Sequence, residues 1–104
     1  MKTNNREIGY SSNTANNYID NKQAIYCLST ELEQQIRFEN GQPTGEIIAY
    51  KSCFSQKGLP PFQVKFESEV VLPAYMAMVE FDKLEACEVG YNVYFRASGI
   101  KEIK

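Results

Sequence analysis

Apolar and polar residues alternate along most of the chain from about residue 23 onward, and a period of two is typical of β-strands that are buried on one face. The clearest case is FQVKFES at 62–68, where Phe62, Val64 and Phe66 are expected to face inward and the residues between them outward. YNVYFRASGI at 91–100 alternates in the same way. Its expected inward residues are Tyr91, Val93, Phe95 and Ala97, and its expected outward residues are Asn92, Tyr94, Arg96 and Ser98.

Turn signals divide the alternating pattern into several strands. The stretch NGQPTG at 40–45 lies between two alternating runs and predicts a hairpin, because Asn-Gly favours the tight turns that join antiparallel strands. The Gly and the paired Pro of SQKGLPP at 55–61 exclude a central strand there. Thr30 and Glu33 have the spacing of a helical capping box, which leaves one helical turn as an alternative before the hairpin. The predicted strands span about residues 23–29, 34–39, 45–55, 62–68, 77–88 and 91–100.

The number and length of these strands predict an all-β domain. Residues 1–22 are rich in Asn, Ser and Thr and are expected to form a flexible N-terminal arm, with a short strand around 7–10. Residues 23–104 are expected to form a single β-barrel domain, because 104 residues support only one core. A barrel of five to six strands, partly open and OB-like, would remove unpaired strand edges. An SH3-like barrel is the second alternative, and an open sheet with one helix is the third.

Composition excludes several classes of function. The chain contains no histidine, which removes Ser-His and Cys-His nucleophiles, imidazole bases and His-containing zinc sites. Cys27, Cys53 and Cys87 are widely spaced and odd in number, which is typical of small buried thiols in a reducing compartment. No phosphate-binding glycine loop or calcium-loop motif is present. We therefore expect no enzyme, no cofactor and no metal, and a cytoplasmic protein without a membrane partner.

Charge is distributed unevenly along the chain, although its net value is only −2. Between Tyr50 and Phe66 every charged residue is a lysine. The following segment, 67–88, carries many carboxylates and only one cation, Lys83. A protein that is acidic overall can therefore present one basic strip.

The basic strip and the outward face of the last strand supply the two groups that hold single-stranded nucleic acid. Such binding combines cations that follow the phosphates with aromatic rings on which the bases stack. Sequence leaves open which face of strand 45–55 is buried: if Ile47, Ala49 and Cys53 face inward, Tyr50 and Phe54 line a surface. The candidate nucleic-acid-binding residues are Tyr50, Lys51, Phe54, Lys57, Lys65, Tyr94 and Arg96.

Four segments, in this order, resemble a known family. They are NGQPTGEIIAYKS at 40–52, FQVKF at 62–66, VEFDKLEA at 79–86 and YNVYFRASGI at 91–100. Over residues 36–101 the chain resembles small OB-fold single-stranded DNA-binding proteins of Gram-positive conjugative elements and phages, including the gene V type. The resemblance implies a protein, often a homo-oligomer, that handles single-stranded DNA during transfer or replication. It places Tyr50, Lys51, Lys65, Tyr94 and Arg96 at stacking and phosphate-contacting positions.

Two hypotheses about function therefore stand side by side. In the first, the protein is a sequence-tolerant single-stranded DNA-binding protein of a mobile element or phage. In the alternative, it is an acidic phage or plasmid protein that binds a host or replication protein through residues 67–88 and does not touch nucleic acid. The first requires Lys51, Lys65, Tyr94 and Arg96 to lie on one concave face, which depends on whether their strands are neighbours.

Overall fold

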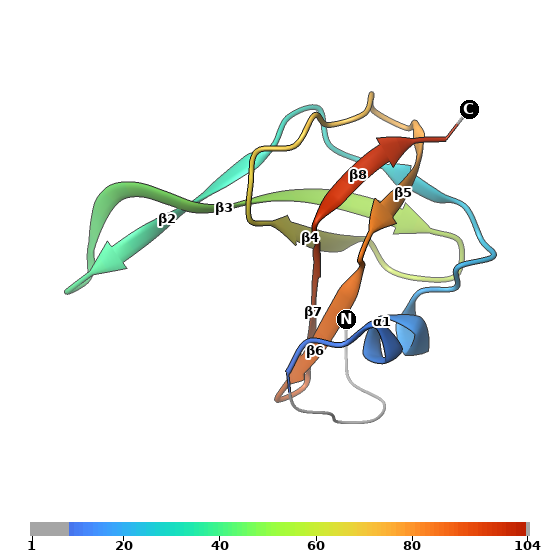
Figure 1. Cartoon of the computed structure of the whole chain (residues 1–104), viewed down its shortest axis with the longest axis horizontal. Helices are drawn as coiled ribbons and strands as arrows, with labels where there is room; N and C mark the ends of the chain where they lie inside the picture. Colours follow the sequence, from blue (N-terminus) through green and yellow to red (C-terminus); the bar gives the residue numbers. More distant parts are fainter. Residues whose placement is uncertain (1–8, 104) are drawn as a thin grey trace.

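The computed structural model describes residues 9–103, which form β-strands and one short helix (Figure 1). The elements are α1 (Ser12–Tyr18), β1 (Ile25–Cys27), β2 (Glu33–Glu39), β3 (Gln42–Gln56), β4 (Phe62–Phe66), β5 (Met78–Asp82), β6 (Glu85–Val89), β7 (Asn92–Ala97) and β8 (Gly99–Glu102). The predicted β class is thus confirmed. The described residues contain no helix that is long and apolar enough to cross a membrane.

The strands form one open sheet of eight strands in the order β6-β7-β4-β3-β1-β5-β8, with β2 paired to β3 outside this path. Neighbouring strands are antiparallel except β4 and β7, which are parallel. In the described part of the chain, the end strands β6 and β8 do not pair with each other. The prediction of a five- to six-stranded barrel is therefore wrong, and the third alternative, an open sheet with one helix, matches the structure.

The strand count differs because the last two predicted strands are each broken in two. The break between β5 and β6 lies at Lys83, whose backbone has a positive φ of 52°. Opposite it, Ser98 donates from its amide to the carbonyl oxygen of Asp82 at 2.9 Å and interrupts β7 and β8. Strands β5 and β8 pair with each other, as do β6 and β7, so both ends of the sheet belong to one bent hairpin. The bend curls the sheet around its core.

The core is built from the inward-facing residues of the curled sheet. Phe54 is fully buried and packs edge-on against Phe81, with their ring centroids 4.9 Å apart. Phe62 packs against Phe95, with the centroids 5.3 Å apart. The buried apolar residues of β4 and β7 are Phe62, Val64, Phe66, Val93, Phe95 and Ala97, as predicted. The exception is Tyr91, which is 81% exposed because it lies in the β6–β7 turn and not in the strand.

Strand β3 buries the face that carries Ser52, Phe54 and Gln56. The sequence left open which face of this strand is buried. In the structure Lys51 and Cys53 lie on the outer face. The buried Gln56 amide is satisfied by the segment after α1: its Nε2 donates to the carbonyl oxygen of Asp20 at 2.6 Å, and its Oε1 accepts from the Asp20 amide at 3.0 Å. The hydrogen bonds attach residues 20–23 to the sheet.

Residues 9–22 contain α1 within the stretch for which a flexible arm was predicted. Ser11 caps the helix, its hydroxyl oxygen accepting from the Thr14 amide at 3.0 Å. Ala15 and Ile19 belong to the buried core, so this part of the stretch is packed. Of the predicted strand at 7–10, residues 7 and 8 lie outside the described residues, and Gly9 and Tyr10 are not in a strand. The adjoining Ser11 forms an isolated bridge with Ala86.

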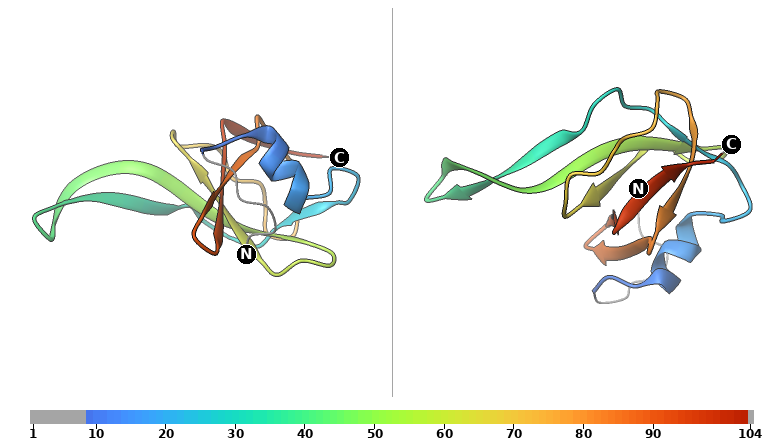
Figure 2. Two further views of the ribbon diagram at one scale, coloured as in Figure 1. Left: turned by 90° about the horizontal axis from the view of Figure 1, so that it is seen from below. Right: turned by 45° about the horizontal axis from the view of Figure 1, so that its top comes forward.

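Strands β2 and β3 extend beyond the body of the protein as a two-stranded ribbon (Figures 1 and 2). We call residues 36–48 the projecting hairpin. Its turn has positive φ values at Asn40 and Gly41, 51° and 77°, as the Asn-Gly signal predicted. Glu33 begins β2 as an extended residue, so the helical turn considered for the Thr30 region does not form.

The burial of Phe54 predicts a large stability effect. Truncation to alanine removes contacts with Phe62 and Phe81, so we expect Phe54→Ala to lower the free energy of unfolding by about 3–5 kcal/mol. The same truncation at Phe38 on the projecting hairpin, where the side chain is 63% exposed, should cost no more than about 0.5 kcal/mol. Urea denaturation of both variants measures the two values, and equal losses would contradict this core.

Candidate nucleic-acid interface

Three cations lie in one row across neighbouring strands. Lys51 on β3 is the register partner of Lys65 on β4, and Lys65 is the register partner of Arg96 on β7. Register partners share one face of a sheet, with their Cβ atoms about 4.5–5.5 Å apart in antiparallel pairs. The basic row, Lys51–Lys65–Arg96, therefore lies on the outer face. The row ends at a glutamate on each side. Glu33 is the register partner of Lys51, and Glu85 is the register partner of Arg96.

The basic row is electrostatically unfavourable without a partner. Like charges placed directly opposite each other on adjacent strands destabilise a sheet. Among the described residues neither Lys51 nor Lys65 forms an ion pair. Two neighbouring ammonium groups are thus available to an anion from outside the protein.

Arg96 is held in place by two contacts. Its Nε donates to Glu85 Oε1 at 3.0 Å, so part of its charge is compensated within the protein. Its guanidinium carbon, Cζ, lies over the ring of Tyr10, 4.1 Å from the ring centroid. Lys65 Nζ also lies over this ring, at 5.9 Å. Tyr10 therefore connects the N-terminal segment to the basic row.

Tyr10 is a site residue that the sequence analysis did not identify. Two backbone hydrogen bonds between Ser11 and Ala86, of 2.9 and 3.0 Å, fix the chain next to it. Burial raises the pKa of Tyr10 to about 12, and a hydrogen bond with the side chain of Cys87 acts in the same direction. Its aromatic character within a polar segment was the only available signal, since its contact with β7 depends on tertiary structure.

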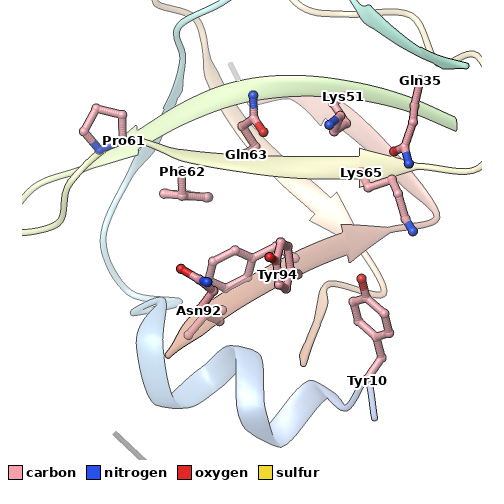
Figure 3. A pocket seen from close by; sticks show the side chains of 11 residues that line it. Tyr10, Gln35, Lys51, Pro61, Phe62, Gln63, Lys65, Asn92 and Tyr94 are labelled. Atoms are coloured by element: carbon pink, nitrogen blue, oxygen red, sulfur yellow. The ribbon is translucent and has the colours of Figure 1, made fainter. Parts of the chain in front are cut away.

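A groove of about 480 Å³ follows the outer face between β3, β4 and β7 (Figure 3). Lys51, Gln63 and Lys65 lie on its β3–β4 side, and Tyr94 lies on the β7 side (Figure 3). Tyr10 closes the end of the groove beneath Lys65 (Figure 3). Tyr94 is 50% exposed, so part of its side chain is accessible to a ligand. The groove thus combines ammonium groups with two phenol rings.

Some of the predicted site residues lie elsewhere. Phe54 is 0% exposed and belongs to the core, so its predicted place on a binding surface is wrong. Tyr50 alternates with Lys51 along β3 and pairs with Phe66, which places it on the opposite face of the sheet. Lys57 lies in the exposed loop between β3 and β4 and does not line the groove. The fold brings together four predicted residues: Lys51, Lys65 and Tyr94 line the groove, and Arg96 lies beside it as the register partner of Lys65.

Three of the six carboxylates of residues 67–88, those of Glu80, Glu85 and Glu88, form an ion pair or a hydrogen bond with another described residue. Glu80 accepts an ion pair from Lys101 at 2.9 Å, and Glu85 is paired with Arg96. Glu88 is only 5% exposed and accepts a hydrogen bond of 2.6 Å from the hydroxyl of Tyr18. Residues from this segment therefore contribute less to an acidic surface than their number indicates. In the described part of the chain, no group of three or more Cys, Asp or Glu residues could hold a metal ion.

Protein-family models, curated proteins and solved structures give no match to this chain. Function is therefore inferred from the groove and its side chains.

The raised pKa of Tyr10 predicts a stability effect at alkaline pH. Tyr10 ionises at its ordinary value of 10.0 in the unfolded chain but at about 12 in the folded protein. Between these values the unfolded state has lost a proton that the folded state keeps, so the free energy of unfolding falls as pH rises. Across this pH interval we expect the free energy of unfolding of the wild type to fall relative to that of Tyr10→Phe, which lacks the ionisable hydroxyl. Urea denaturation at stepped pH measures it, and a difference independent of pH would contradict this environment.

Proposed function

We propose that the protein binds single-stranded DNA in the groove between β3, β4 and β7. The observation that carries this proposal is the basic row, in which Lys51 and Lys65 stand side by side without an ion pair to another described residue. Tyr94 and Tyr10 line the same groove. Cations beside accessible rings are the combination that single strands require.

The two kinds of side chain have separate roles. Lys51 and Lys65 contact phosphates, and the counterions that they displace make the affinity depend on salt. Tyr94 offers its accessible ring to an unpaired base, which contributes about 1–3 kcal/mol per base whatever its identity. The ring of Tyr10 packs against the guanidinium of Arg96 and limits the groove at one end. This division of roles favours a sequence-tolerant mode of binding.

The glutamates at the ends of the basic row keep the binding site short. Glu33 and Glu85 would repel phosphates beyond Lys51 and Arg96, so about two or three phosphates are contacted. For a single strand this number gives a slope of log affinity against log salt of roughly −1.4 to −2. An acidic net charge is compatible with such a site, because binding depends on the local potential.

The alternative function, binding of a host protein through residues 67–88, has less support. Glu80, Glu85 and Glu88 are engaged with Lys101, Arg96 and Tyr18. The cytoplasmic setting stays a prediction from the composition of the sequence, and a role in the transfer or replication of a phage or conjugative element stays a prediction from the resemblance. An enzyme remains disfavoured by the lack of histidine.

Fluorescence anisotropy with a labelled oligo-dT tests this proposal. We expect Lys65→Ala to weaken binding and to reduce the salt slope by about 0.7. Tyr94→Ala should cost about 1–3 kcal/mol without changing the slope, because stacking displaces no counterion. Lys57→Ala, an exposed lysine outside the groove, is the matched control and should leave both values unchanged. An absence of binding at micromolar protein in low salt would refute the proposal.

Glu85 allows the two functions to be separated. Replacing its carboxylate with an amide removes a negative charge beside Arg96, so we expect Glu85→Gln to strengthen DNA binding by about 0.2–1 kcal/mol, or up to about fivefold. A surface that binds a basic host protein would instead lose affinity for its partner. Anisotropy at low salt measures the change, with Glu80→Gln as the control on a different strand pair. Weaker DNA binding by Glu85→Gln would contradict the proposed polarity of the groove.

A further inference from the structure

The projecting hairpin exposes apolar side chains both near its tip and at its base. Phe38 is 63% exposed, and Ile47 and Ile48 are 39% and 44% exposed. Phe38 is the register partner of Pro43 and is separated from the Asn40–Gly41 turn by the single pair Glu39–Gln42. A two-stranded ribbon alone in water is at best marginally stable, so burial of this apolar surface would stabilise it. The hairpin therefore has the properties of an element that is covered by another molecule.

The charge of the hairpin indicates what kind of surface would cover it. Arg37 lies 3.5 Å from Glu39 and 3.4 Å from Glu46, so two carboxylates share one guanidinium. The tip is consequently apolar with a surplus negative charge. A complementary site would be an apolar hollow with a cation at its rim.

Such a hollow lies on the opposite side of the body. It encloses about 410 Å³ between α1, β1 and β5, and its apolar lining includes Ile19, Ile25, Val79 and Phe81. About half of the lining residues are polar, and the one carboxylate among them, Glu80, is paired with Lys101 at 2.9 Å. Lys83 lies at its edge, is exposed, and forms no ion pair with any described residue. Figures 1 and 2 show the hairpin tip at one end of the long axis, and α1 and β5 toward the other. We call this hollow the α1–β5 pocket.

We propose that the projecting hairpin of one copy of this chain inserts Phe38 into the α1–β5 pocket of a second copy. Phe38 fits the pocket in chemistry, since an aromatic side chain buries roughly 150–250 Å² when it is enclosed. Glu39, one residue beyond Phe38, then meets Lys83 at the rim. The apolar part of the pocket lining covers the Phe38 ring, and the surplus negative charge of the hairpin meets Lys83, while Glu80 in the same lining is already paired with Lys101. A second copy of this chain is therefore a complementary partner.

The position of the two surfaces determines the form of the assembly. The hairpin and the pocket are different surfaces, so each contact leaves one free hairpin and one free pocket at its ends. Heterologous contacts of this kind propagate into open chains unless the rotation between copies closes a ring. If the groove binds DNA as proposed above, copies held on one strand would meet at high effective concentration, and a weak contact would suffice for cooperative binding.

Two complementary variants test the contact without DNA. Phe38→Ala removes the hairpin anchor and keeps the pocket, whereas Asn16→Trp, at an exposed α1 position lining the pocket, blocks the pocket and keeps the hairpin. Sedimentation velocity from micromolar to millimolar protein should show growing species for the wild type and monomers for each variant. An equimolar mixture of the variants should form dimers and stop there, because only one productive contact remains. Asn17→Trp, on the same helix but outside the pocket, should associate like the wild type.

Each other result overturns the inference. A wild type that stays monomeric at millimolar protein excludes the contact, whether or not the protein binds DNA. Association that survives Asn16→Trp but not Phe38→Ala indicates direct pairing of two hairpins. If Asn16→Trp does not fold by circular dichroism, Lys83→Glu serves as the pocket variant, and Glu39→Lys in the same chain should restore the association that it abolishes. If the chain that carries both Lys83→Glu and Glu39→Lys does not associate, the Glu39–Lys83 contact is contradicted.

Discussion

The parallel pairing of β4 with β7 is the constraint on which the rest of the structure depends. Val64 is the register partner of Phe95, and Lys65 is the register partner of Arg96. Because side chains alternate along both strands, one register places the apolar residues in the core and the cations side by side outside. A shift of one residue would exchange the two faces. The burial that stabilises the sheet therefore also assembles the basic row.

Burial on the inner face explains how β3 and β4 accommodate the like charges of Lys51 and Lys65. Repulsion between Lys51 and Lys65 opposes the pairing, but the phenylalanines on the inner face contribute far more through burial. Glu85 and the ring of Tyr10 stabilise the third cation, Arg96. The two lysines keep their charge available, which is the property that a phosphate-binding groove needs.

The bend in the last hairpin determines both the open sheet and the freedom of the β2–β3 ribbon. Lys83 and Ser98 divide the hairpin so that one half pairs with β4 and the other half with β1. The core is then enclosed without β2, which pairs only with β3. The ribbon is consequently left outside the core, and its apolar tip is exposed at one end of the molecule. The α1–β5 pocket forms where α1, which packs against β6, and β5 line the same hollow.

The sequence by itself determined where most strands run and which residues of β4 and β7 are buried. These features follow from a local period of two, which can be read within a few residues. It also predicted that Lys65, Tyr94 and Arg96 face outward. It could not show that the strands break at Lys83 and Ser98. Both residues continue an extended sequence pattern, and the breaks arise where the sheet curls around its core. The packing of α1 was equally hidden in a polar segment.

Only the tertiary structure decided which outward-facing residues are neighbours. Lys65 and Arg96 are distant in sequence and meet because β7 returns beside β4 after a long connection. Phe54 was assigned to a surface on a strand with two partly apolar faces, and its pairing with Phe62 placed it in the core. Tyr10 reaches Arg96 through the bridge between Ser11 and Ala86, for which the sequence has no local signal. Strand alternation is a local property, whereas adjacency between strands arises from long-range pairing that the burial of the whole core selects.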